Sequence, residues 1–106
     1  MSTRYLESLF NPSSIVVIGA SERADNLGGM VLRNLLGGGY PTEKLLVINQ
    51  SGYDNVHGVP CVPKVAKMEF TPDLAITCTP PDTVAKTIKR LGEAGVRTAI
   101  VMTGGM

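Results

Sequence analysis

The sequence predicts an α/β fold: a Rossmann-like open parallel sheet with helices on both faces. Apolar runs without polar alternation occur at residues 15–18, 45–48, 74–78 and 98–102, and the first of them is mostly β-branched. Such runs are typical of strands buried on both faces of a parallel sheet. Segments with helical spacing follow the first and third runs, which is the order of βαβ units. A length of 106 residues suits one domain, residues 1–106.

An amphipathic helix is expected over residues 4–10, before the first strand. It ends at Asn11-Pro12, because the residue before a proline is disfavoured in a helix. The first strand, residues 15–18, runs directly into the turn Gly19-Ala20-Ser21. Glycine lets the backbone bend sharply and approach a ligand closely, since it has no Cβ. This turn is the first candidate binding feature.

The next helix is predicted over residues 27–35, where apolar residues keep roughly helical spacing. Asp25 or Asn26 can cap its start, and the glycines at 37–39 end it. The second strand, residues 45–48, then leads into a polar end. This helix and the two strands around it form the first βαβ unit.

The middle of the chain, residues 52–67, is rich in turns, and a very short extended piece is expected at Val59, Cys61 and Val62, bracketed by Gly58, Pro60 and Pro63. The third strand follows at residues 74–78 and is broken by the prolines after it. Asp82 is then expected to cap a helix whose apolar residues recur at i, i+4 and i+7, with its basic residues, Arg90 among them, pointing outward. The fourth strand, residues 98–102, closes the pattern, and its position at the end of the chain predicts that the chain is a fragment of a longer multidomain protein.

Composition argues against several classes of function. A net charge of +1 without a block of Lys or Arg gives no support for binding of nucleic acid or of a membrane surface. No apolar run approaches the ~20 residues that span a bilayer, and no signal peptide is evident, so a cytoplasmic protein is expected. Cys61 and Cys78 lack CxxC spacing, so buried free thiols are expected rather than a disulfide or a metal site.

Polar turns follow the predicted strands at their carboxyl ends: Gly19-Ala20-Ser21, Asn49-Gln50-Ser51, Thr79-Pro80-Pro81 and Thr103-Gly104-Gly105. In a parallel sheet these turns share one edge, which is where open α/β sheets bind ligands. Their hydroxyls, amides and backbone N–H groups suit phosphate and carbonyl oxygens, and helix N-termini favour anions. A purely structural role stays open, because most strand-to-helix turns contain Gly, Ser or Thr.

Motifs of the common nucleotide-binding classes are absent. A GxGxxG fingerprint is missing, and Asn49-Gln50 stands where NAD-binding proteins carry an acid, which disfavours NAD. The pattern GxxxxGK[ST] of P-loop ATPases is missing too. No catalytic residue is assigned, since His57 lies in a turn without an identifiable partner. Lys44, Lys64 and Lys67 could reach a phosphate, but lysines on loops are usually only solvated. Arg23 is the better candidate cation, although a plain surface role is favoured for it as well.

A set of short segments recurs here in the order of a known family: Phe10-Asn11-Pro12, residues 14–21, Arg33-Asn34-Leu35-Leu36, Gly39-Tyr40, Val47-Ile48-Asn49, Gly58, Pro72-Asp73-Leu74-Ala75 and Pro80. With these segments the chain resembles the CoA-binding domain that opens NDP-forming acyl-CoA synthetases, which is akin to the succinyl-CoA synthetase α subunit. Residues 4–9 and 70–75 favour one member, the Pat-type bacterial protein lysine acetyltransferase, in which a synthetase-like region precedes a GNAT domain.

The resemblance implies that the chain is the N-terminal part of a CoA-binding domain, with coenzyme A or acetyl-CoA as its ligand. The family often carries Asn-Pro and a basic residue after the second strand, whereas here Asn49 is followed by Gln50-Ser51, so a positive contact to the CoA phosphates is missing there. Carried to matching positions, and with Arg23 added, the implied cofactor site comprises Gly19, Ala20, Ser21, Arg23, Asn49, Thr79, Pro80, Thr103 and Gly104.

Two functions follow from the resemblance. The main reading is a regulatory CoA- or acyl-CoA-binding domain of a Pat-type acetyltransferase, and the alternative is the CoA-binding part of an ADP-forming acetyl-CoA (acyl-CoA) synthetase. Phosphohistidine, ATP-grasp and GNAT motifs are absent, so the chain alone is expected to be inert. A third reading is a domain that binds nothing and serves as a dimer or interdomain surface. Expected partners are a CoA-type ligand and the remaining domains of the parent chain, with a homo-oligomer as a further option.

Overall fold

The computed structural model describes residues 12–102, so the helix expected over residues 4–10 and the turn at 103–105 lie outside the described residues. Six strands in this part of the chain form one sheet in the order β3-β4-β2-β1-β5-β6. The parallel strands are β1 (Ile15–Ile18), β2 (Leu45–Ile48), β4 (Val59–Val62), β5 (Leu74–Thr77) and β6 (Thr98–Val101). The edge strand β3 (Asn55–Val56) pairs with β4 in the antiparallel sense. The predicted Rossmann-like fold is confirmed, with a sheet that is mostly rather than wholly parallel.

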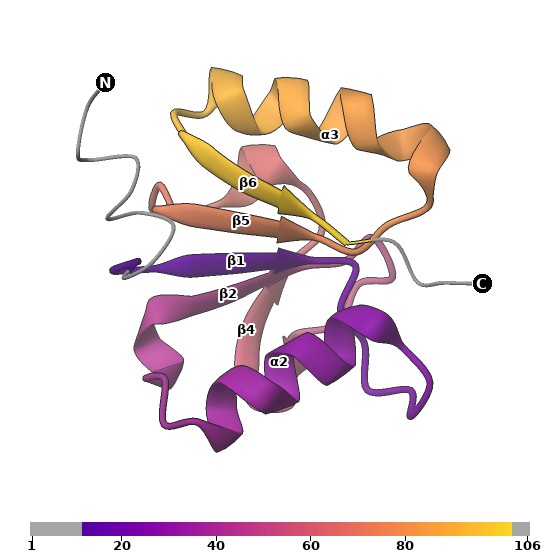
Figure 1. Cartoon of the computed structure of the whole chain (residues 1–106), viewed down its shortest axis with the longest axis vertical. Helices are drawn as coiled ribbons and strands as arrows, with labels where there is room; N and C mark the ends of the chain where they lie inside the picture. Colours follow the sequence, from indigo (N-terminus) through magenta and orange to yellow (C-terminus); the bar gives the residue numbers. More distant parts are fainter. Residues whose placement is uncertain (1–11, 103–106) are drawn as a thin grey trace.

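Helices cover both faces of this sheet. Helix α2 (Leu27–Gly37) lies on one face and α3 (Pro81–Glu93) on the other, as Figure 1 shows. Two short 3₁₀ helices, η1 (Thr42–Lys44) and η2 (Val65–Lys67), precede β2 and follow β4. The predicted layer arrangement is therefore present in the described residues.

Successive residues of the central strands point to opposite faces, which divides the core in two. On the α2 side the buried residues include Ile15, Val17, Leu45, Val47, Leu74 and Ile76. On the α3 side they include Val16, Ile18, Leu46, Ile48 and Ala75, which pack with Leu91 of α3. Strands β1, β2 and β5 are buried along their whole length, which explains why their sequences lack polar alternation.

Helix α2 packs unusually closely on the turn after β1, because its first turn contains two glycines. A Cβ added to Gly28 would lie 2.7 Å from the Cα of Ala20, and one added to Gly29 would meet the carbonyl oxygen of Ser21. Contacts this short are not tolerated for real Cβ atoms. These glycines therefore set the distance between the helix and the strand end.

The start of α3 differs from the prediction. Asp82 was expected as its cap, but Pro80 occupies the N-cap position, Pro81 is the first helical residue and Asp82 lies inside the first turn. The fixed φ of proline suits the first helical position, where its missing N–H leaves no bond unmade. The prediction of Asp82 as the cap was wrong because it placed the helix start after this proline.

The very short extended piece predicted at Val59, Cys61 and Val62 is present as strand β4. Residues 59–62 form the full strand β4, which pairs with the carboxyl half of β2 through Val47 with Cys61 and Ile48 with Val62. Strands β5 and β6 each end one residue earlier than predicted. Adding β4 beside β2 brings η2, the segment after β4, to the carboxyl edge of the sheet.

Candidate functional site

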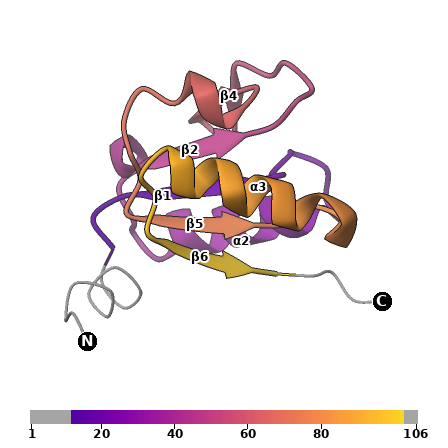
Figure 2. The same ribbon diagram turned by 90° about the horizontal axis from the view of Figure 1, so that it is seen from above.

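A crevice of about 420 Å³ opens at the carboxyl edge of the sheet, on the face covered by α3. This volume lies within the range of small-molecule pockets, roughly 300–1,000 Å³. Figure 2 looks onto this face, where α3 lies over the sheet and the segment following β4 lies to one side of it. The crevice is lined by Ile18, Gly19, Ile48, Asn49, Gln50, Ser51, Lys64, Val65, Thr79, Pro80, Thr83, Thr87 and Arg90.

The position of the crevice follows from the strand order. Strand β1 pairs with β2 on one side and with β5 on the other, and the helices that follow β1 and β5 lie on opposite faces. The chain therefore changes direction at β1, and such a switch point leaves a gap beyond the carboxyl ends of the strands. Ile18 and Ile48, the last residues of β1 and β2, line the crevice and are 5% exposed. They give it an apolar wall.

Gly19 lies in the crevice lining, as predicted, but the fold itself demands this glycine. Its φ is +93°, a backbone conformation that other residues rarely adopt. A Cβ at this position would lie 2.9 Å from the carbonyl oxygen of Cys78. The N–H of Gly19 donates to the carbonyl of Ile48 at 2.8 Å, so the turn is tied to β2. The glycine therefore permits close packing between strand ends.

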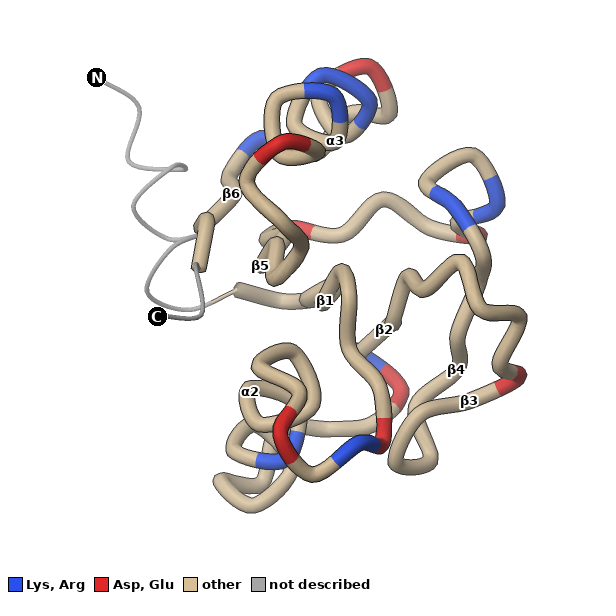
Figure 3. Tube along the Cα trace, turned by 90° about the vertical axis from the view of Figure 1, so that its right-hand side faces the viewer, with Lys and Arg blue, Asp and Glu red and all other residues tan. Residues whose placement is uncertain are grey.

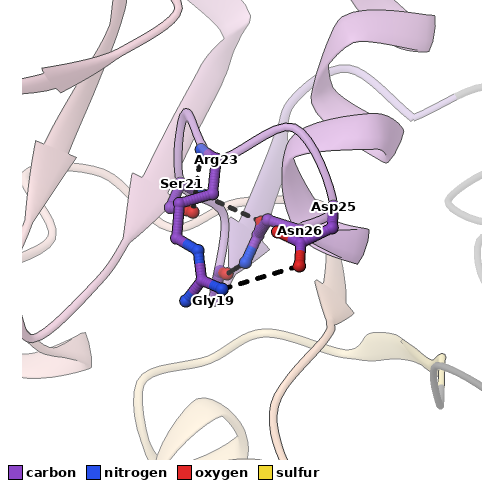
Figure 4. Close-up of polar contacts among 5 residues, drawn as sticks. All are labelled: Gly19, Ser21, Arg23, Asp25 and Asn26. Atoms are coloured by element: carbon purple, nitrogen blue, oxygen red, sulfur yellow. Dashed lines mark hydrogen bonds and ion pairs between the residues drawn. The ribbon is translucent and has the colours of Figure 1, made fainter.

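Asn26 organises the rest of the Gly19-Ala20-Ser21 turn, as Figure 4 shows. Its Oδ1 accepts the N–H of Ser21 at 2.9 Å and the N–H of Gly29 at 2.6 Å. Its Nδ2 donates to the carbonyl of Gly19 at 3.2 Å. Of the two residues proposed as the helix cap, Asn26 is therefore the one used. The N–H of Ser21, a predicted phosphate donor, is already engaged by a side chain.

Three other predicted site residues lie outside the crevice lining. Ala20 is fully buried and packs in the core on the α2 side, and Ser21 is 5% exposed. The side chain of Arg23 is 76% exposed, and its Nη2 lies 3.5 Å from Oδ2 of Asp25. The structure therefore does not bring these residues together with the crevice, and their contact with a ligand stays a prediction.

The turn after β2 lines the crevice, and its first residue has a structural role. Asn49 Nδ2 donates to the carbonyl of Ala20 at 2.8 Å, which joins the ends of β2 and β1. Its Oδ1 accepts the N–H of Ser51 at 2.8 Å. Both ends of the amide are thus engaged, while Gln50 and Ser51 stay exposed at the rim.

Thr79 and Pro80 complete the predicted set that the crevice brings together, while Thr103 and Gly104 lie outside the described residues. Among residues 12–102, the hydroxyl of Thr79 is one of three buried side-chain groups without a hydrogen-bond partner. A buried hydroxyl without a partner costs free energy, and Thr79 is the residue among these three that lies in the crevice lining. The Thr83 hydroxyl is engaged instead, since it donates to the carbonyl of Pro80 at 2.8 Å.

Sequence reasoning missed the wall formed by α3 and η2. Thr83, Thr87 and Arg90 stand at i, i+4 and i+7, so they share one face of α3. Arg90 was expected to point outward, and Lys64 was considered for a phosphate but interpreted as solvated; both line the crevice. The helical spacing of the two threonines with Arg90 was a usable signal, although the sequence alone did not show what this face meets.

The remaining candidates lie away from this chemistry. The backbone N–H of His57 donates to Glu22 at 2.9 Å, and His57 is not in the crevice lining. Cys61 and Cys78 are free thiols, and burial raises the pKa of Cys78 to about 11. Within the part of the chain that the structure describes, no cluster of metal-ligating side chains occurs. The helices among these residues are also too short or too polar to cross a membrane.

The crevice suits a phosphorylated nucleotide carrying an apolar or flexible arm. Aliphatic side chains at the strand ends can contact such an arm or a base, and the unpartnered Thr79 hydroxyl and two cations can meet oxygens. Coenzyme A has these parts, so the residues present fit it.

The fold and the crevice define a Rossmann-like domain with a crevice at its switch point, where domains of this fold bind ligands. The family model described as "CoA binding domain" matches residues 13–106, and the chain belongs to that family. Family membership supports the predicted coenzyme A ligand.

Three proteins similar to the chain are CoA ligases or synthetases. The chain is 32% identical over 100 residues to the ADP-forming acetate–CoA ligase I of Archaeoglobus fulgidus, covering 94% of this chain and 14% of that protein. It is 35% identical over 100 residues to the α subunit of the ADP-forming acetate–CoA ligase II of Pyrococcus furiosus, covering 94% and 21%. In structure it is similar to the dinucleotide-forming acetyl-coenzyme A synthetase 1 of Ca. Korarchaeum cryptofilum in its apo form. That match has a TM-score of 0.86 and 42% identity and covers 95% of this chain and 22% of that one.

These relatives favour the predicted alternative, the CoA-binding region of an ADP-forming synthetase, over the Pat-type acetyltransferase. The chain spans between 14% and 22% of the lengths of the acetate–CoA ligases that it matches.

Proposed function

We propose that the chain supplies the coenzyme A site of a larger ADP-forming acyl-CoA synthetase. The observation that supports this is the crevice at the carboxyl edge, in a chain that belongs to the CoA binding domain family. The thiol of coenzyme A supplies the acyl acceptor, which carries the acyl group as a thioester. The residues of this chain bind and orient the carrier, and the groups that activate the acid belong to other domains.

The predicted cofactor residues have different roles in this proposal. Gly19, Asn49, Thr79 and Pro80 line the crevice and shape its floor and rim. In our proposal the Thr79 hydroxyl donates to a ligand oxygen, since it has no other partner within residues 12–102. Asn49 holds the strand ends in place rather than contacting the ligand through its amide.

A Pat-type acetyltransferase parent is the second candidate. The sequences at residues 4–9 and 70–75 favour it, whereas the relatives named above are ligases and synthetases. The full-length reading frame separates the two. A phosphohistidine domain together with an ATP-grasp domain supports the synthetase, and a C-terminal GNAT motif supports the acetyltransferase.

Isothermal titration calorimetry of the purified chain with CoA and with NAD tests the binding function. We expect CoA to bind and NAD to bind much more weakly, because the chain lacks the GxGxxG turn and the acid that NAD requires. Equal binding of both ligands, or no binding of CoA, contradicts the proposal.

A pair of variants tests whether the crevice is the site. Gln50→Trp places a large side chain at the crevice rim, where Gln50 is exposed. Thr42→Trp places the same side chain at an exposed position just before the amino end of β2, whereas the crevice lies at the carboxyl end. We expect Gln50→Trp to weaken CoA binding and Thr42→Trp to leave it unchanged. Equal affinities for the two variants would place the site elsewhere.

A further inference from the structure

We propose that Lys64 and Arg90 together bind a phosphate group of the nucleotide end of coenzyme A. This inference rests on the proposed function and names the residues that make the crevice selective for a phosphorylated ligand. Both side chains line the crevice, and they come from different elements, η2's N-cap position and the last turn of α3.

Charge is segregated at this site. The whole chain is nearly balanced, with 10 Lys and Arg against 9 Asp and Glu. The crevice lining nevertheless contains two basic residues and no acidic residue. Figure 3 views this edge of the sheet and shows basic positions on α3 and on the segment after β4, at either side of the carboxyl ends of the strands. A crevice lined by charge of one sign concentrates ligands of the opposite sign.

Helix geometry brings the charge of Arg90 toward the ligand. Helix α3 begins directly after β5 at the carboxyl edge, and Arg90 lies about 10 Å along the helix from Thr83, at 1.5 Å per residue. Helical side chains tilt toward the N-terminus of their helix. The long Arg90 side chain is therefore directed back toward the carboxyl edge. Thr87, one turn before it on the same face, adds a hydroxyl to this wall.

Lys64 approaches from the other side because of β4. It follows the carboxyl end of β4 in an extended conformation, with φ −159° and ψ 163°, immediately before η2. Since β4 runs parallel to β2, its carboxyl end reaches the same edge as those of β1 and β2. Lys64 thus reaches the crevice by the same topology that places the polar turns there.

Both cations are available for a ligand. The ion pair found within residues 12–102 joins Arg23 to Asp25, so neither Lys64 nor Arg90 has an acidic partner there. Each is exposed to solvent. The turn after β2, Asn49-Gln50-Ser51, contains no basic residue. Lys64 and Arg90 would supply the positive charge at the crevice from other elements.

The test compares Lys64→Gln and Arg90→Gln with Lys67→Gln and Lys89→Gln. Each control removes one positive charge from the same element, η2 or α3, at a position outside the crevice lining. Titration calorimetry measures the Kd of each variant for CoA and for dephospho-CoA, and a thermal melt checks folding. We expect each crevice variant to weaken CoA binding by about tenfold or more, the effect of losing one charged hydrogen bond. The controls should change Kd by less than about threefold, as expected for more distant, screened charges.

The dephospho-CoA arm identifies the phosphate. If the two cations bind the 3′-phosphate, the variants lose affinity for CoA but not for dephospho-CoA. If they bind the diphosphate, both ligands lose affinity equally. Either result supports the inference. The inference is overturned if the wild-type chain binds CoA but the crevice variants bind it as tightly as their controls. The proposed function stands in that case. A wild-type chain that does not bind CoA overturns both.

Discussion

Replacing Asn26 with alanine should destabilise the domain far more than is usual for a loop residue. Asn26 accepts hydrogen bonds from the N–H groups of Ser21 and Gly29 and donates one to the carbonyl of Gly19. One of these is the N-cap bond of α2, for which Ala substitution costs about 1 kcal/mol. The other two contribute about 1 kcal/mol each, and Ser21 is buried, so its N–H would be left without water. The free energy of unfolding should fall by about 3 kcal/mol.

Urea denaturation followed by circular dichroism measures this change, with an unchanged m-value as the sign of a pure stability effect. A loss of about 3 kcal/mol corresponds to a fall in Tm of roughly 15 °C for a domain of this size. Asn34→Ala is the matched control, because Asn34 is exposed on the same helix and alanine favours helix there. Asn26→Asp keeps the accepting oxygen and loses the donor to Gly19, so it should cost about 1 kcal/mol. A loss below about 1 kcal/mol for Asn26→Ala would refute the view that this side chain holds the turn.

Two further predictions concern the ends of β1 and β5. Gly19→Ala should lower the free energy of unfolding by about 2 kcal/mol, because φ is +93° and the new Cβ would lie 2.9 Å from the Cys78 carbonyl oxygen. Gly92→Ala, with open space around it, should be neutral or stabilising, and equal melting temperatures for the two variants would contradict this reasoning. In a Cys61→Ser background, Cys78 should react slowly with a thiol reagent at pH 8 and faster as pH rises. Its pKa is about 11, so only about one thiol in a thousand is then a thiolate. Rapid labelling of the folded variant at pH 8 would show that burial does not control this thiol.

The sequence allowed the strands to be predicted well because their burial leaves a simple signal. Three of the four apolar runs match strands buried along their length, and polar turns follow them at the expected edge. Strand β4 was expected only as a very short extended piece, and its place in the sheet was not predicted, since Pro60 and flanking turn residues interrupt its apolar pattern. Its partner is β2, 14 residues or more away in the sequence, as in the pairing of Val47 with Cys61. Pairing of this kind is decided by the sheet and not by local preference.

The same limit explains why half of the crevice was missed. Apolar spacing in α3 correctly identifies the side that packs on the sheet, through Leu91 and Ile88. It does not say which of the polar flanks meets another element, because that depends on where the segment after β4 lies. Arg90 therefore reads as solvated until β4 is placed beside β2.

The turn Gly19-Ala20-Ser21 shows why a phosphate need not be bound by backbone N–H groups in this fold. In open α/β sheets, free N–H groups after the first strand commonly bind phosphate. Here the N–H of Gly19 donates to Ile48 and that of Ser21 to Asn26, so the fold itself uses both. If the crevice binds a phosphorylated ligand, the side-chain cations Lys64 and Arg90 on its other wall are then the main source of attraction that we propose. Binding by exposed cations is screened by salt, whereas binding by buried N–H groups is screened much less. On this argument the affinity for CoA should fall as ionic strength rises, and the fall should be smaller once Lys64 and Arg90 are neutralised.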